Sequence, residues 1–164
     1  MRPATILVAS VGRQRYLVEA FAAACGPGDR VLACDLDPLA AGGAVAARFL
    51  RAPRFDGPDY GPWLLELCRA EGVTLLLTLN ADELVRLEAL RPALADAGTT
   101  LLGMPAPRLA TCLDKGRLGE LSEGTGLRVP SAWPGDAWRD APAGAYPLLA
   151  KPRGGRGSRG LTVL

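Results

Sequence analysis

Short apolar runs alternate with amphipathic segments along the first hundred residues. Two of these runs, ATILVAS and VTLLLTLN, are continuous and apolar, which is typical of strands buried on both faces. We predict strands at residues 4–10, 30–35, 48–53, 73–80 and 99–103. Apolar residues recur at helical spacing between them, which predicts helices at residues 15–25, 40–47, 58–70 and 81–97. This alternation predicts an α/β fold, a Rossmann-like three-layer parallel sheet with right-handed crossovers.

The pattern changes after Gly103, where prolines become frequent. We predict one helix at residues 106–123 with a break near Asp114, followed by a hairpin in which YPLLAKP and LTVL flank the loop RGGRGSRG. A natural domain rarely ends on an unpaired hairpin edge. The sequence therefore predicts a complete domain at residues 1–104 and a truncated α+β domain at residues 105–164.

Composition narrows the class of protein. No apolar run approaches the roughly 18 to 20 residues that span a bilayer, and the apolar start is too short for a signal peptide. We therefore expect a cytoplasmic protein without a membrane partner. The four cysteines are far apart and the chain has no histidine, which argues against a zinc site and a serine triad and favours reduced thiols.

The basic residues are unevenly distributed. Residues 151–164 contain four basic side chains and no acid, while the rest of the chain has 15 basic and 17 acidic residues. This distribution does not indicate a general nucleic-acid surface. Arginine outnumbers lysine 17 to 2, so Lys115 and Lys151 mark positions where a compact charge beside phosphate oxygens could be required.

Ligands of doubly wound sheets gather at the carboxyl ends of the strands, so the loops there are the first candidate sites. The loop after the first strand has Arg13 but no GxGxxG fingerprint. Arg13 is either a solvent-exposed side chain or a clamp for a carboxylate or phosphate. After the second strand, Asp35 and Asp37 could bind a ribose, whereas Asp37 before Pro38 could equally cap a helix.

Polar residues also open the helix that follows the fourth strand. Asn80, Asp82 and Glu83 could serve as helix cap and as first-turn acids that complement the helix dipole. The alternative is a polar contact to a substrate in the same crevice. The residues alone leave both interpretations open.

The glycine-rich loop is the stronger signal. Its glycines at 154, 155, 157 and 160, together with Ser158, could present backbone N–H groups to phosphate oxygens without obstruction by side chains. It is not a Walker A loop, because no GK[ST] follows. A disordered basic loop is the alternative.

Several segments resemble ATP-grasp proteins related to the large subunit of carbamoyl phosphate synthase. They are SVGRQRYLVEAF, DLDPLA, LTLNADEL, LATCLDKGRLGELSEGTGLRVPSAW and YPLLAKPRGGRGSRGLTVL, which together cover essentially the whole chain. The resemblance implies that Lys115 and Lys151 contact ATP phosphates under a lid formed by residues 154–160. The implied ATP-binding set is Lys115, Lys151, Arg153, Gly154, Gly155, Gly157, Ser158 and Gly160.

The resemblance also implies a reaction. Residues 1–104 would be a pre-ATP-grasp domain that helps to form the acceptor-substrate site, with Arg13, Asn80 and Glu83 on the substrate side. The complete enzyme would use MgATP to phosphorylate a carboxylate, and an amine would then attack the acyl phosphate. The metal ligands of the family lie farther along, so we expect the chain alone to be catalytically incomplete and to hold no metal ligand.

Two other classes remain open. The chain could be a non-catalytic Rossmann-like binding module, or the subunit of a split enzyme that needs a separately encoded half. The expected partners are small-molecule carboxylates and amines, with a homodimer or a missing C-terminal half also open. Nucleic-acid binding through RGGRGSRG is disfavoured because the motif is short and lacks aromatic residues. The absent GxGxxG disfavours an NAD-dependent oxidoreductase.

Overall fold

The computed structural model describes residues 3–155 and 157–164. The chain divides into two compact units, Met1–Met104 and Pro105–Leu164. Each unit has its own sheet. Among the described residues, no helix has both the length and the apolar character that would let it cross a bilayer.

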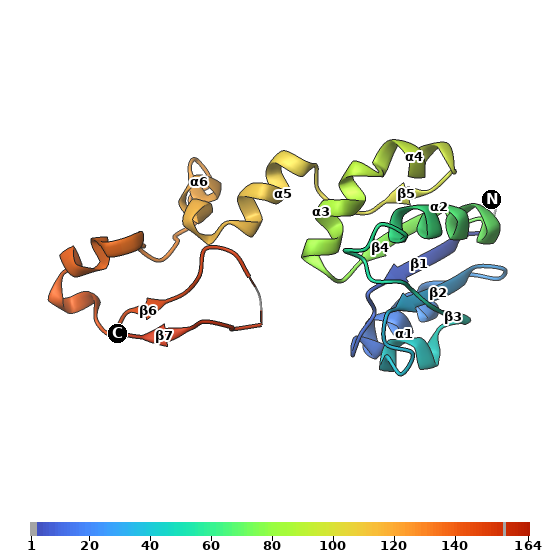
Figure 1. The fold of residues 1–164 in the computed structure, drawn as a ribbon, viewed down its shortest axis with the longest axis horizontal. Coiled ribbons are helices and arrows are strands. Elements are labelled where there is room, and N and C mark those ends of the chain that lie inside the picture. The colour runs from blue at the N-terminus through green and yellow to red at the C-terminus, as the bar shows by residue number, and fades with distance from the viewer. Residues whose placement is uncertain (1–2, 156) are drawn as a thin grey trace. The chain divides into compact units, whose positions relative to one another are not determined.

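The first unit contains a five-stranded, wholly parallel sheet (Figure 1). Its strands are β1 (Thr5–Ala9), β2 (Arg30–Asp35), β3 (Arg48–Arg51), β4 (Leu75–Thr78) and β5 (Thr100–Leu101). They lie in the order β3-β2-β1-β4-β5. The order reverses at β1, so the loops that follow β1 and β4 start on either side of the switch point where doubly wound sheets bind ligands. The predicted α/β class with a parallel sheet is confirmed.

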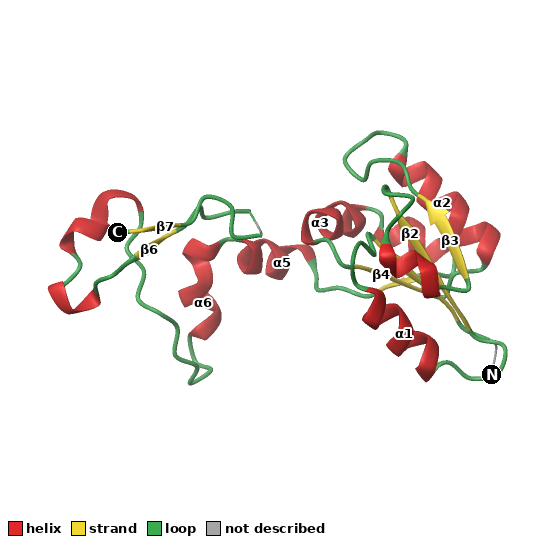
Figure 2. Cartoon of the chain, turned by 90° about the horizontal axis from the view of Figure 1, so that it is seen from below, coloured by secondary structure: helices red, strands yellow, loops and turns green. Residues whose placement is uncertain are grey.

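Helices cover both faces of this sheet, which gives the three layers (Figure 2). They are α1 (Arg15–Ala24), the 3-10 helix η1 (Ala41–Val45), α2 (Tyr60–Glu71), α3 (Ala81–Ala89) and α4 (Arg91–Asp96). Side chains alternate along each strand. On β1, Leu7 packs in the cluster that contains side chains of α2, α3 and α4, whereas its neighbour Val8 packs with α1 and η1.

Two predicted helices of the first unit differ from the structure. The helix expected at residues 81–97 is broken at Leu90 into α3 and α4. Pro92 follows the break, and a proline inside a helix removes one hydrogen bond and clashes with the preceding turn, so the single helix could not continue. The segment expected to be an α-helix at residues 40–47 forms only the short η1, because Gly42 and Gly43 are poor helix formers.

The second unit consists of short elements and a hairpin. These are α5 (Ala106–Leu113), η2 (Lys115–Arg117), α6 (Leu118–Ser122), η3 (Gly135–Asp140), η4 (Ala143–Ala145), β6 (Leu149–Ala150) and β7 (Thr162–Val163). The predicted break at Asp114 is confirmed: this residue is extended, and its side chain accepts a hydrogen bond from the Gly116 amide at 2.9 Å. β6 and β7 pair antiparallel, and mutual backbone bonds between Leu148 and Leu164 continue the pairing.

Candidate functional site

The carboxyl ends of β1, β2 and β4 meet at one edge of the sheet in the first unit. In the register of the parallel strands, Ala9 at the end of β1 lies opposite Cys34 on β2 and Thr78 on β4. Three predicted features therefore share this edge: the loop with Arg13, the acids after β2, and the start of α3. Parallel strands produce this convergence because all their loops emerge on the same side.

The loop after β1 is held tightly by its neighbours. The Val11 amide donates to the carbonyl oxygen of Cys34 at 3.3 Å, and the Gly12 amide donates to Asp35 Oδ2 at 2.8 Å. Gly12 has a φ of +47°, a conformation that glycine adopts without strain. Gly42 packs so closely against Val11 that a Cβ there would lie 2.2 Å from Val11 Cγ2.

The acids after β2 stabilise turns. Asp35 Oδ2 accepts from Gly12, while Oδ1 accepts from the Asp37 amide at 2.9 Å. Asp37 Oδ1 in turn accepts from the Leu39 amide at 2.9 Å. Asp37 therefore closes a turn and does not cap a helix, because η1 begins only at Ala41.

Arg13 and Asn80 lie at this edge in different settings. Arg13 is exposed at the turn that precedes α1. Asn80 is half-buried and is the N-cap of α3, because its Oδ1 accepts from the Asp82 amide at 3.1 Å. The capping interpretation of Asn80 is therefore observed.

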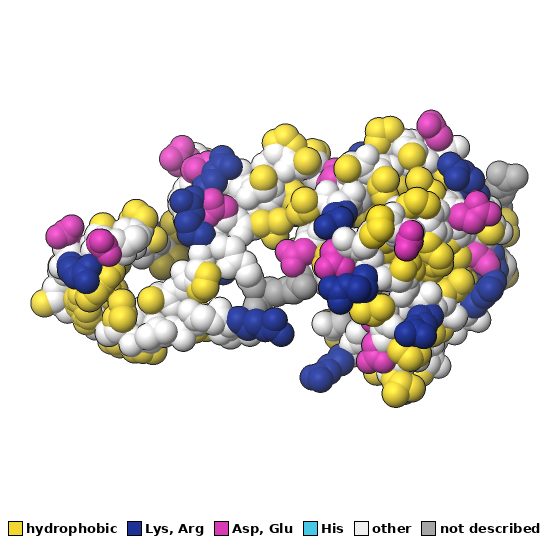
Figure 3. All heavy atoms as spheres, in the orientation of Figure 1, with side chains coloured by type: hydrophobic (Ala, Val, Ile, Leu, Met, Phe, Trp, Pro, Cys, Tyr) yellow, Lys and Arg dark blue, Asp and Glu magenta, His cyan; other side chains and the backbone are white. Residues whose placement is uncertain are grey.

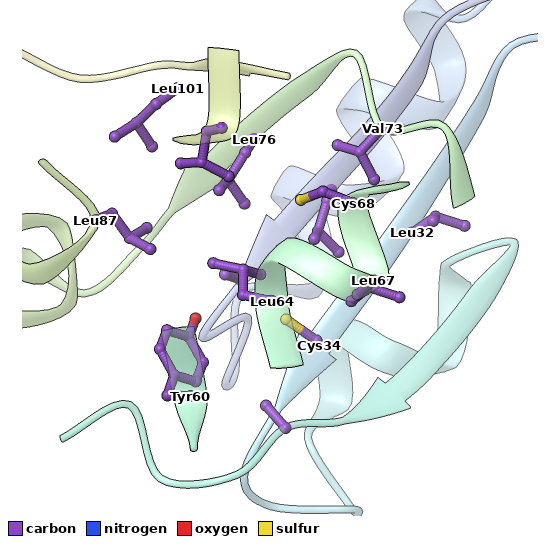
Figure 4. Close-up of a cluster of buried hydrophobic side chains, with 14 residues drawn as sticks. Leu32, Cys34, Tyr60, Leu64, Leu67, Cys68, Val73, Leu76, Leu87 and Leu101 are labelled. Carbon is purple, nitrogen blue, oxygen red and sulfur yellow. The ribbon is translucent and has the colours of Figure 1, made fainter. Parts of the chain in front are cut away.

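Glu83 is placed inside the unit, with 1% of its surface exposed. One carboxylate oxygen accepts from the hydroxyl of Tyr60 on α2, and the other accepts from the hydroxyl of Thr78 at the end of β4. Tyr60 lies in the cluster of buried side chains that also contains Leu64 and Cys34 (Figure 4). Tyr60 and Thr78 were not identified from the sequence, because a hydroxyl on an amphipathic helix or strand carries no signal of its partner.

In the second unit, Lys115 lies against the glycine-rich loop. Its ammonium group donates to the carbonyl oxygens of Gly155 at 2.9 Å and of Arg153 at 3.4 Å. Its backbone amide also donates to the Arg153 carbonyl oxygen at 3.0 Å. The structure therefore brings together three residues of the implied ATP-binding set that are up to 40 positions apart.

An ion pair fixes the start of the loop. Arg153 donates from Nε to Asp114 Oδ1 at 2.9 Å and from Nη2 to Oδ2 at 2.5 Å. The Arg153 guanidinium holds the pKa of the Asp114 carboxyl below its ordinary value, with a smaller contribution from the Gly116 amide. The pair also explains the small residue at position 116, where a Cβ would lie 2.7 Å from Arg153 Nε.

The rest of the loop is exposed and turns through unusual backbone conformations. A φ in the left-handed region occurs at Gly155, Gly157, Ser158 and Gly160. This region is open to glycine without strain, whereas a non-glycine residue such as Ser158 rarely adopts it. Gly154 has open space around it, and the expected lid also includes Arg156, which lies outside the described residues.

Lys151 is exposed directly after β6. Its side chain forms no ion pair with any residue in the described ranges 3–155 and 157–164.

Within those same ranges, no group of three or more acidic, cysteine or histidine side chains is arranged to hold a metal ion. On the face that Figure 3 shows, Lys and Arg side chains lie among Asp and Glu side chains.

Comparison with known proteins gives one family match. Residues 6–102 match the family described as PylC-like, N-terminal domain. No match to a curated protein is found.

Solved structures share the fold. The biotin carboxylase domain of 2-oxoglutarate carboxylase from Hydrogenobacter thermophilus, solved with MgADP, ADP and bicarbonate, has a TM-score of 0.67 and 20% identity over 99% of this chain and 38% of its own. The N5-carboxyaminoimidazole synthetase of Staphylococcus aureus has a TM-score of 0.64 and 18% identity over 98% of this chain and 40% of its own. Glycinamide-RNase-transformylase T of Mycobacterium tuberculosis has a TM-score of 0.54 and 22% identity over 78% and 37%. The chain thus spans well under half the length of these proteins, and at these identities the likeness shows the fold.

Proposed function

The chain belongs to the family of PylC-like N-terminal domains, as the match over residues 6–102 shows, and from this premise we propose that it is the front part of an ATP-grasp ligase. The ATP-grasp resemblance of the sequence is thereby confirmed at the level of family and fold. The proposed activity is ATP-dependent joining of a carboxylate to an amine through an acyl phosphate.

The contact between Lys115 and the glycine-rich loop carries this proposal. The Lys115 ammonium lies 2.9 Å from the Gly155 carbonyl oxygen, so a lysine and the glycine-rich backbone lie side by side. Phosphate oxygens need such donors, and charge that develops on a transferred phosphoryl group is stabilised by donors already in position. These residues therefore fit the phosphate end of a nucleotide.

Three groups have distinct roles in the proposed site. Lys115 and Lys151 supply compact positive charge, and the left-handed glycines turn amides toward the phosphates. Asp114 keeps Arg153, and with it the start of the loop, beside Lys115. Magnesium, when bound with ATP, would neutralise further phosphate charge; we assign none of its ligands to the described residues.

The substrate side of the proposal lies in the first unit. Arg13 is exposed and could pair with a carboxylate. The Asn80 side chain caps α3 at the same edge of the sheet, beside the switch point. Glu83 was expected on the substrate side as well, but both of its carboxylate oxygens accept hydrogen bonds inside the unit, so we propose that Arg13 and Asn80 make the direct contacts.

ATP binding tests the proposal. Titration calorimetry with MgATP should show saturable binding that Lys115→Ala abolishes, while Arg128→Ala, which removes one exposed positive charge from the same unit, leaves it intact. If Lys115→Ala binds MgATP as the unaltered chain does, the nucleotide assignment fails and the alternative, a non-catalytic binding module or a split-enzyme subunit, is favoured.

A further inference from the structure

A buried polar group in the first unit is not used by the proposed function. The Glu83 carboxylate is 1% exposed and Tyr60 is 3% exposed. Burying a carboxylate is unfavourable unless its oxygens are hydrogen-bonded. Here one carboxylate oxygen accepts from the Tyr60 hydroxyl on α2, and the other accepts from the Thr78 hydroxyl at the end of β4.

The hydrogen bonds have a defined direction. The Thr78 hydroxyl donates a hydrogen bond to Glu83 Oε2, so its one proton is used there. That leaves the lone pairs of Thr78 Oγ1 free to accept, and the Asn80 amide donates to this oxygen at 3.0 Å. Glu83 therefore selects the orientation in which Thr78 can hold the Asn80 backbone.

The same loop is anchored on its other side. The Leu79 amide donates to the Ala9 carbonyl oxygen at 3.2 Å, at the end of the neighbouring strand β1. The peptide that leads into Asn80 is thus bonded to β1 through Leu79 and to Glu83 through Thr78. Of these two anchors, only the second depends on a charged side chain.

We propose that Glu83 is a positioning residue whose buried carboxylate orients the Thr78 hydroxyl and thereby fixes the Asn80 backbone at the carboxyl end of β4. Its importance for substrate binding rests on the proposed function, because that function places Asn80 beside the substrate. The link from Glu83 to Asn80 is a property of the folded chain without any ligand. The two ideas can therefore fail separately.

Hydrogen exchange measured by NMR on the full chain, without nucleotide, tests the link. Tyr60→Phe removes one donor to Glu83 but keeps the bond to Thr78, so it controls for general loosening of the core. Glu83→Leu breaks the link to Thr78. If that single variant does not fold, Tyr60→Phe/Glu83→Leu serves instead, because removing both partners avoids a buried phenol without an acceptor.

The readout is exchange of the Asn80 amide relative to the Leu76 amide in β4. We expect about a 3- to 10-fold rise in this ratio for Glu83→Leu or the double variant, which corresponds to the loss of one hydrogen bond, and no rise for Tyr60→Phe. An unchanged ratio in the Glu83 variants would overturn the proposal. The proposal would also be overturned if the Tyr60→Phe protein folds and the double variant does not, because Glu83 would then act in folding as a whole.

Discussion

Arg153 donates to both carboxylate oxygens of Asp114, at 2.9 and 2.5 Å, across 39 positions of sequence. Asp114 lies at the break between α5 and η2, and Arg153 follows Lys151 and Pro152 at the start of the glycine-rich loop. It is largely exposed on the arginine side, and such pairs contribute little to global stability. The pair therefore acts locally, by keeping the start of the glycine-rich loop beside Lys115.

Asp114→Asn should loosen this geometry without unfolding the unit. We expect faster exchange of the Lys115 amide, which bonds the Arg153 carbonyl oxygen, and little change in melting temperature. Glu120→Gln is the matched control, since it breaks the exposed Arg117–Glu120 pair in the same unit. Because Arg153 lowers the pKa of Asp114, the contribution of the pair is present above the ordinary carboxyl pKa of 3.8 and is lost as the pH falls below that value. Equal exchange in both variants would contradict this role.

The sequence predicted local elements better than it predicted contacts. Every strand of the parallel sheet was located. β1 and β4 gave the clearest signal, because a doubly buried strand is a continuous apolar run between turn residues. The break at Asp114 was also located, but the one at Leu90 was missed, because the helical stripe continues across Pro92. The burial of Glu83 and its bonds to Tyr60 and Thr78 could not be predicted, since they depend on how three elements pack together.

Tyr60→Phe should destabilise the first unit. The change leaves one oxygen of the buried Glu83 carboxylate without a donor, at a cost of about 1–3 kcal/mol in the free energy of unfolding. Urea unfolding followed by circular dichroism measures it. Tyr16→Phe is the control, because Tyr16 is 67% exposed and its substitution should leave the free energy unchanged. A similar effect at both tyrosines would contradict the buried bond.

The cysteines should differ in reactivity toward iodoacetamide. Cys34 and Cys68 are buried, whereas Cys112 is exposed. Burial, and for Cys34 the nearby Glu83 charge, raises the pKa of the buried thiols above the ordinary value of 9.0. Iodoacetamide should therefore modify Cys112 in the native protein, and Cys34 and Cys68 only after unfolding, as mass spectrometry would show.

The sign of the pH effect follows from the raised thiol pKa. The contribution of the buried, neutral thiols to the free energy of unfolding is fully present below pH 9.0. It is lost as the pH rises above that value, because the thiols of the unfolded chain ionise there and the buried ones do not. Urea unfolding at pH 8 and pH 10 measures the loss, with Cys112→Ser as a control that should not alter it. In the iodoacetamide experiment, modification of native Cys34 at the rate of Cys112 would contradict the burial of Cys34.

Gly42→Ala should disturb the loop after β1. The added Cβ would lie 2.2 Å from Val11 Cγ2, and Val11 is fully buried, so the side chain cannot move without disturbing the core. We expect a loss of about 1–3 kcal/mol in the free energy of unfolding. Gly119→Ala is the control: it lies in α6 with open space around it, and alanine there should be neutral or stabilising by up to about 1 kcal/mol. Equal effects would mean that the approach of Gly42 to Val11 is not tight.

Lys115→Arg separates charge from shape at the proposed phosphate site. The ammonium of Lys115 reaches the carbonyl oxygens of both Arg153 and Gly155 as a compact donor. A guanidinium keeps the charge but is planar and bulkier, so it cannot take the same position against the loop. We expect MgATP affinity to fall about tenfold or more, equivalent to about 1.4 kcal/mol.

The control for this change is Arg128→Lys, the reverse exchange at an exposed position of the same unit, which should leave affinity as it was. Titration calorimetry measures both variants, and exchange of the Lys115 amide reports whether the loop stays in place. Undiminished affinity with arginine at position 115 would mean that only positive charge is needed there. In that case the survival of lysine at this position, in a chain with 17 arginines and 2 lysines, would need a different explanation.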